Sequence, residues 1–220
     1  MLRSYFLLAS CCLLFAYSVS AGAENYNDGL VHYEAGDYAK AYCIWSQLAE
    51  KNHVAAQYSL GWMYANGEGL AVNAKEGIKW WRKSAALGHP DAHFAMALAY
   101  TTGEGVKKNA LKAIEWHIDA SQLGHEDSQS ILYDLIVGKF NKLERAQQEL
   151  LQEAWRMLGT SNFIDTKVAN VRRGPGKKYR VIASLKAGDE IVEFQKKNGW
   201  VQIGVLRKRK VGWVHQSLIP

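Results

Sequence analysis

The stretch Leu60-Gly61-Trp62-Met63-Tyr64-Ala65-Asn66-Gly67-Glu68-Gly69 decides how most of this chain folds. Its last three residues return as Gly103-Glu104-Gly105, 36 positions further on. Other positions repeat with the same spacing: Tyr64 and Tyr100, Trp80 and Trp116, Gly88 and Gly124, His89 and His125, Asp91 and Asp127. A fixed period of this length indicates a repeat architecture, in which each repeat is one small structural unit.

Each period predicts two helices joined by a glycine turn. The first helix is expected over residues 54–65, where apolar residues recur at four-residue steps. Gly67 and Gly69 then interrupt it, because glycine readily adopts the positive φ that such a turn needs. Asn73 is a typical N-cap for the second helix, which should end at Gly88. Helix pairs this short cannot bury their apolar faces alone, so we expect them to stack into an α-solenoid.

The repeat resembles the Sel1-like repeat family, a relative of the tetratricopeptide repeats. The matching motifs are Leu60-Gly61-Trp62-Met63-Tyr64, then Gly67-x-Gly69-Leu70, then Trp81 with Lys83-Ser84-Ala85-Ala86. Two departures are Asn73 and Asn109 in place of the family's usual aspartate cap, and Ala97-Leu98 where the family prefers Leu-Gly. The resemblance implies an adaptor that gathers other proteins or peptides.

The last sixty residues have a different pattern, with short β-rich runs separated by glycine turns. The runs are 168–172, 180–183, 190–194, 200–203 and 211–214. Five short strands in so few residues predict a small β-barrel. The period fails after Ser130, and residues 143–158 suggest one closing helix before the barrel.

This region resembles the bacterial SH3 domain. The matching motifs are Asn170-Val171-Arg172-Arg173-Gly174-Pro175-Gly176, Val181-Ile182 with Leu185 and Gly188, Asn198-Gly199-Trp200-Val201, and Val211-Gly212-Trp213-Val214. The departure is a basic run, Arg207-Lys208-Arg209-Lys210, where many relatives have a short Asp-Gly turn. The resemblance implies a domain that binds cell wall or peptide.

The N-terminus has the layout of a secretory signal peptide. Arg3 precedes an uncharged apolar run, and Ala21-Gly22-Ala23 is a small-x-small cleavage pattern. We therefore expect three parts: a signal peptide (1–23) cleaved after Ala23, a Sel1-like α-solenoid (24–159) and a bacterial SH3 domain (160–220). The predicted fold class is thus multi-domain α + β, and the predicted location is the periplasm. An uncleaved membrane anchor, or a lipoprotein signal at Cys11, remains open.

Charge divides with these parts. Residues 160–220 contain thirteen Lys and Arg against four Asp and Glu, a net charge of +9, whereas residues 24–159 carry a net charge of −4. A strongly positive domain attracts anions. An exported protein rarely meets nucleic acid, so we expect an anionic envelope polymer instead, such as peptidoglycan or lipopolysaccharide. Alternatively, the basic run is a solvated hairpin tip, or the barrel docks on its own acidic repeats.

The binding candidates are basic and aromatic side chains. For the barrel they are Arg172, Tyr179, Trp200, Arg207, Lys208, Arg209, Lys210 and Trp213. Trp200 and Trp213 are equally explained as core residues. For the repeats the candidates are Trp62 and His93, because their repeat equivalents differ in residue type.

The sequence contains no catalytic motif of a hydrolase, no phosphate-binding loop and no redox dithiol, and we expect neither a cofactor nor a metal. His53, His89 and His125 share one register of the repeat, which would separate them by a helix layer and prevent them from binding one metal ion. The sequence therefore predicts a non-enzymatic periplasmic adaptor: the repeats hold an envelope protein or peptide, and the barrel binds cell wall or another envelope component. The alternative is a regulatory subunit or inhibitor of a cell-wall hydrolase.

Overall fold

The computed structural model describes residues 25–220, so the expected signal peptide lies outside them. The chain forms two compact units, one ending at Lys108 and the other beginning at Asn109. This division falls inside the region predicted as one solenoid, residues 24–159. The second unit therefore contains helices as well as strands.

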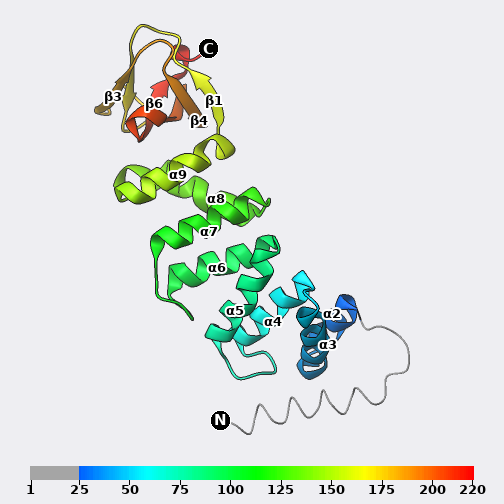
Figure 1. Cartoon of the computed structure of the whole chain (residues 1–220). Helices are drawn as coiled ribbons and strands as arrows, with labels where there is room; N and C mark the ends of the chain where they lie inside the picture. Colours follow the sequence, from blue (N-terminus) through cyan, green and yellow to red (C-terminus); the bar gives the residue numbers. More distant parts are fainter. Residues whose placement is uncertain (1–24) are drawn as a thin grey trace. The chain divides into compact units, whose positions relative to one another are not determined.

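The first unit consists of antiparallel helices joined by short turns (Figure 1). They are α2 (Tyr26–Glu34), α3 (Tyr38–Glu50), α4 (Val54–Asn66), α5 (Ala74–Ala86) and α6 (Pro90–Thr102). The helices expected from the sequence at α4 and α5 are confirmed, and the Asn73 side chain caps α5 by accepting a hydrogen bond from the Glu76 backbone N–H.

Two tryptophan–glycine contacts bring neighbouring helices close together. The Trp81 ring lies against Gly61, where a methyl group would come within 2.3 Å of the indole. The Trp81 Nε1–H donates to the Tyr58 carbonyl at 3.2 Å. Trp45 repeats this arrangement one repeat earlier, over Gly29. The missing side chain thus lets an indole fill the space between two helices, and both indoles are buried.

The turn glycines have the expected left-handed conformation. Gly67, Gly69, Gly103 and Gly105 have φ values of 75°, 70°, 88° and 70°. Gly69 is also close to the neighbouring helix, because a methyl group there would lie 2.4 Å from the Tyr38 Cβ atom. Backbone freedom and packing therefore both explain the glycine at this position.

The second unit begins with helices and continues into a sheet. The helices are α7 (Ala110–Gln122), α8 (Glu126–Asp134) and α9 (Arg145–Leu158), with a π-helical turn at Leu135–Lys139 and a 3-10 turn at Phe140–Lys142. The single helix predicted before the strands is confirmed as α9.

The strands form one antiparallel sheet in the order β1-β4-β5-β6-β2-β3. They are β1 (Thr160–Phe163), β2 (Ala169–Arg172), β3 (Val181–Leu185), β4 (Glu190–Lys197), β5 (Trp200–Val205) and β6 (Lys210–His215). The five predicted strands are present, and β1 is an additional one. Within residues 160–220 no pairing joins β1 to β3, so the sheet is open where a closed barrel was expected.

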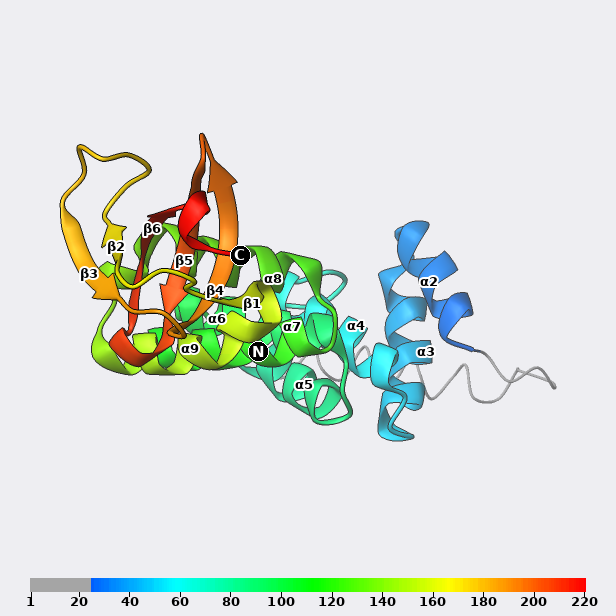
Figure 2. The same ribbon diagram turned by 90° about the horizontal axis from the view of Figure 1, so that it is seen from above.

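Both faces of the sheet are covered at its central strand β5. The side chains on one face pack against one another in a hydrophobic core that includes Val171, Ile203 and Val214. On the other face Val192 and Val211 pack against the helices. Figure 2 shows α9 beside the strands. Every residue of β5 is accordingly buried, because neither face of this strand is open to solvent.

Candidate binding sites

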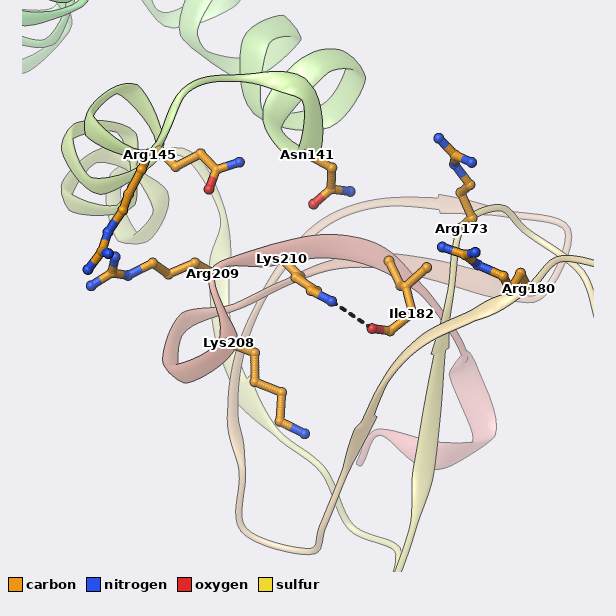
Figure 3. Close-up of a pocket in the computed structure, with 9 residues that line it drawn as sticks. Asn141, Arg145, Arg173, Arg180, Ile182, Lys208, Arg209 and Lys210 are labelled. Atoms are coloured by element: carbon orange, nitrogen blue, oxygen red, sulfur yellow. Dashed lines mark hydrogen bonds between the residues drawn. The ribbon is translucent and has the colours of Figure 1, made fainter.

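The second unit contains an open pocket of about 500 Å³ between the start of α9 and the sheet. Every charged side chain that lines it is cationic. The lining residues are Asn141, Arg145, Gln148, Arg173, Arg180, Ile182, Lys208, Arg209 and Lys210 (Figure 3). We call this the basic pocket.

Local irregularity in the sheet creates the basic pocket. Strands β2 and β6 pair at Arg172 and Trp213. Further along β6, the backbone of Val211 is satisfied by a side chain instead of a strand: Asn141 donates to its carbonyl and accepts from its N–H at 3.1 Å. On the other wall, the Arg173 N–H donates to the Arg180 carbonyl at 3.0 Å, which holds these two arginines across one loop.

A carboxylate from α9 partly balances one end of the basic pocket. Glu149 Oε1 accepts a hydrogen bond from the Arg145 Nε at 3.0 Å and another from the Arg209 guanidinium. These contacts, first that with Arg145, lower the pKa of Glu149. Both guanidinium groups therefore lie together, as Figure 3 shows.

The two lysines of the basic pocket contact β3. Lys210 Nζ donates to the Ile182 carbonyl at 3.0 Å, drawn as a dashed line in Figure 3. Lys208 donates to the Ser184 carbonyl. Each ammonium group has three N–H donors and uses one in these contacts. Three of the four residues of the basic run thus line the pocket, and two of these, Lys208 and Lys210, are exposed to solvent.

The remaining candidates of the predicted barrel lie elsewhere. Arg207 extends towards Asp189, with its Nη1 atom 3.8 Å from the Asp189 Oδ1 atom. Arg172 donates to the carbonyls of Lys177 and Tyr179, at 2.9 and 2.8 Å, and so shapes the loop between β2 and β3. The Tyr179 ring covers Gly174 and is 38% exposed.

Trp200 and Trp213 are both buried. Trp200 packs edge-on against His215 at 5.4 Å. Trp213 lines a smaller pocket of about 170 Å³, whose other wall is the π-helical turn. Of the two readings left open for these tryptophans, burial favours a core position for Trp200, while Trp213 also faces a pocket.

The first unit contains a second pocket, of about 210 Å³, with a mostly aromatic lining. Its residues come from α2, α3 and α4: Tyr26, Leu30, Tyr33, Trp45, Tyr58, Ser59 and Trp62. We call this the aromatic pocket. Trp62 is 43% exposed, whereas Trp45 is only 2% exposed. The candidate Trp62 therefore forms an accessible wall and Trp45 a buried one.

Hydroxyl groups add polarity to the aromatic pocket. Tyr26 and Ser59 share a hydrogen bond of 3.1 Å, and the Tyr33 hydroxyl donates to Glu68 at 2.6 Å. Burial and the contact with Glu68 raise the pKa of Tyr33, so its hydroxyl stays protonated at neutral pH. The pocket thus presents apolar rings together with neutral hydroxyls.

His93 does not line the aromatic pocket. Its Nε2 lies 2.9 Å from the Ala85 carbonyl, which makes it a link between α6 and α5. The histidines of the repeat register begin helices: His53 and His125 each accept the N–H of the third residue that follows, at 3.3 Å. His89 stacks on Tyr58 with ring centres 4.9 Å apart. These contacts explain why histidine recurs there.

Two further observations concern residues 25–220 only. Their side chains include no group of three or more His, Cys, Asp or Glu residues placed to hold a metal ion. Nor does this part of the chain have a helix long and apolar enough to cross a membrane.

The sequence indicated three of the six cations that line the basic pocket. Lys208, Arg209 and Lys210 form an obvious charge run, whereas Arg145, Arg173 and Arg180 were not selected. Arg173 and Arg180 do carry a signal, since they flank a Gly-Pro-Gly turn and hairpin geometry would bring them together. Arg145 carries none, because only the packing of α9 on the sheet brings it near.

The fold defines a class of protein in which helical repeats are joined to a small β domain. Residues 54–89 and 90–125 match the family model of the Sel1 repeat, and residues 167–220 match that of the bacterial SH3 domain. The chain therefore carries two Sel1 repeats and a bacterial SH3 domain. These families are typically non-catalytic interaction modules.

Solved structures support the repeat assignment. A Sel1 repeat protein from Oxalobacter formigenes is 26% identical with a TM-score of 0.52, over 60% of this chain and 54% of that one. A protective antigen of uropathogenic Escherichia coli strains, which displays an SLR fold, is 29% identical with a TM-score of 0.51, over 60% of this chain and 28% of that one. The chain thus matches about half the length of the first protein and less of the second. No curated protein matches the chain.

Proposed function

We propose that this chain is a non-enzymatic adaptor of the bacterial cell envelope. Its Sel1 repeats bind a protein or peptide, and its bacterial SH3 unit binds cell wall or another anionic envelope component. Sel1 repeats and bacterial SH3 domains are modules of protein–protein interaction and of possible cell-wall binding. The observation that carries the proposal for this chain is the basic pocket, which six cationic side chains line.

The basic pocket suits an anionic ligand for electrostatic reasons. Like charges gathered in one hollow repel one another, and a bound anion relieves that repulsion. The pocket is open to solvent, so the attraction is screened by salt and should weaken as ionic strength rises. Envelope polymers carry many carboxylates or phosphates, and several contacts at once would compensate for the weakness of each one.

The aromatic pocket suits a side chain of a partner peptide. Its volume of about 210 Å³ corresponds to one large residue, and its exposed Trp62 offers a rigid apolar surface. Aromatic residues in such pockets contribute strongly to binding energy in protein interfaces. The repeats thus supply a partner site separate from the basic pocket.

The periplasmic location is part of the proposal and rests on residues 1–23. Protein purified from the native source should begin at or near Glu24 and fractionate with the periplasm. An intact Met1, or a lipid on Cys11, in the purified protein would refute cleavage after Ala23.

The envelope role is tested by sedimentation of the full-length protein with peptidoglycan sacculi and, separately, with lipopolysaccharide. The protein should sediment with at least one of them at low salt. Lys208→Gln/Lys210→Gln should reduce the bound fraction several-fold, because it removes two cations from the pocket.

Lys196→Gln/Lys197→Gln is the matched control. It removes the same charge from exposed positions at the end of β4, outside the pocket. If the parent protein binds neither material, or if both double variants bind equally, the second unit does not bind envelope polymers through the basic pocket.

A further inference from the structure

We infer that the aromatic pocket receives a cationic side chain, the ammonium group of a lysine or the guanidinium group of an arginine in a partner protein. The inference rests on the proposed function only in taking the repeats as the part that holds a protein or peptide. It goes further by naming the chemistry of the partner residue. It concerns the first unit alone.

The aromatic rings of this pocket form one cluster. The ring centre of Trp45 lies 5.3 Å from that of Tyr33 and 5.7 Å from that of Tyr26. Trp62 is exposed, so a side chain from outside can reach its ring directly. A cation within about 6 Å of the centre of a tryptophan or tyrosine ring is attracted by the negative face of that ring. Several rings around one small volume therefore suit a cationic group as well as an apolar one.

A carboxylate beside the pocket favours the cation. Glu68 Oε2 accepts a hydrogen bond of 2.6 Å from the hydroxyl of Tyr33, which is one of the lining residues. Within residues 25–220 the Glu68 side chain forms no ion pair with a lysine or arginine. A carboxylate has about four lone-pair sites, so Glu68 can still accept N–H groups from a bound cation.

Tyr33 holds this carboxylate in place. Burial, and then the hydrogen bond and charge of Glu68, raise the pKa of Tyr33, so the phenol keeps its proton and donates it at neutral pH. Glu68 is only partly exposed, so water screens its charge less than that of a fully exposed carboxylate. A carboxylate that is positioned before binding also reduces the entropy lost when the ligand arrives.

The charges around the pocket are mostly negative. Residues 25–70, which include all the helices that line it, contain five Asp or Glu against two Lys, a net charge of −3. None of the lining side chains is cationic. Burial, and then the negative charge of Asp91, raise the pKa of Tyr58, another lining residue, to about 12. An anionic side chain of a partner would therefore be repelled and a cationic one attracted.

An apolar side chain is the other occupant that such rings could accept. It would contact the rings, but it would take water away from Glu68 without supplying a counter-ion. The two occupants thus differ in how they depend on Glu68. Only a cationic side chain should bind more weakly when that charge is removed.

The test is NMR titration of the full-length protein, followed through the indole N–H signal of Trp62, which is assigned from its loss in Trp62→Phe. The probes are blocked tripeptides in which lysine, arginine or norleucine stands between two glycines. Norleucine has the aliphatic chain of lysine without the ammonium group. At least one cationic peptide should bind saturably and about tenfold more tightly than the norleucine peptide, because a charge-assisted hydrogen bond contributes about one order of magnitude in affinity.

Glu68→Gln should weaken the binding of that cationic peptide about tenfold. The glutamine carbonyl can still accept the Tyr33 hydroxyl, so this variant removes the charge and keeps the hydrogen bond. Glu104→Gln is the matched control. It makes the same change in the Gly-Glu-Gly turn of the next repeat, 36 residues later and outside the pocket, and should bind as the parent does.

Equal affinity for the norleucine and cationic peptides overturns the inference, as does equal affinity of Glu68→Gln and Glu104→Gln for the cationic peptides. Tighter binding of the norleucine peptide would assign the pocket to an apolar side chain, and the proposed partner site in the repeats would still stand. If no peptide shifts the Trp62 signal, the inference and the partner site at this pocket both fail. Sedimentation with peptidoglycan and lipopolysaccharide tests the basic pocket separately.

Discussion

The indole of Trp155 lies directly on Gly204, where a methyl group would come within 2.5 Å of its Cε3 atom. Trp155 belongs to α9 and Gly204 to β5, so this contact joins a helix predicted as part of the repeats to the central region of the sheet. The Trp155 ring also packs edge-on against Phe140 and Phe194, at 4.7 and 5.9 Å. Helix α9 therefore shares a hydrophobic core with the sheet.

Trp155→Ala should accordingly destabilise the second unit by about 3–5 kcal/mol, the usual cost of removing a fully buried aromatic side chain. Urea denaturation followed by circular dichroism measures the change. Met157→Ala in the same helix should cost much less, because Met157 is 40% exposed. A loss for Trp155→Ala as small as that for Met157→Ala would show that α9 does not anchor the sheet.

Two glycines with the same backbone conformation should differ in their tolerance of alanine. Gly69 and Gly88 have φ values of 70° and 84°, so each should lose about 1 kcal/mol from backbone strain. Only Gly69→Ala also places a methyl group against Tyr38, whereas Gly88→Ala meets nothing within 4 Å. Thermal unfolding should therefore show a larger loss for Gly69→Ala. Equal losses would mean that the α3 contact does not matter.

His117 predicts how stability depends on pH. Burial lowers its pKa to about 4, and its Nδ1 lies 3.1 Å from the Ser128 hydroxyl. In the unfolded chain its pKa returns to about 6.5, so the unfolded state binds the proton more tightly. The free energy of unfolding should fall by about 3 kcal/mol as pH decreases from 6.5 to 4. Below pH 4 the contribution of His117 should not change further.

Comparison of the parent with His117→Gln isolates this contribution, because the variant cannot titrate there. Urea denaturation at several pH values gives the two curves. If the parent and His117→Gln lose the same stability between pH 6.5 and 4, the buried imidazole is not the cause. A pKa near 6.5 for His117 in the folded protein, measured by NMR, would contradict the prediction directly.

Trp62 and Trp45 should separate binding from folding in the aromatic pocket. Trp62→Ala should cost about 1 kcal/mol or less in stability, because the ring is 43% exposed, while Trp45→Ala should cost about 3–5 kcal/mol. Both residues line the pocket. Once a peptide partner is known, Trp62→Ala should abolish its binding in fluorescence titration without unfolding the protein. Unchanged affinity would place the partner site elsewhere.

The sequence by itself determined the repeats and their turns. A 36-residue period, glycines at the turns and asparagine caps are local signals, and helices at α4 and α5 follow from them. Strands β2 to β6 also follow from short alternating runs and glycine turns. Such signals act within a few residues along the chain, so no knowledge of distant contacts is needed to read them.

Only the tertiary structure decided which basic residues share a pocket. Arg145 and Arg180 are far apart in the sequence, and they line one pocket because α9 packs on the open sheet. The same packing buries Trp155 and leaves Asn141 to satisfy the Val211 backbone. Long-range contacts of this kind depend on the shapes of two surfaces, and a surface exists only after its own helix or sheet has formed.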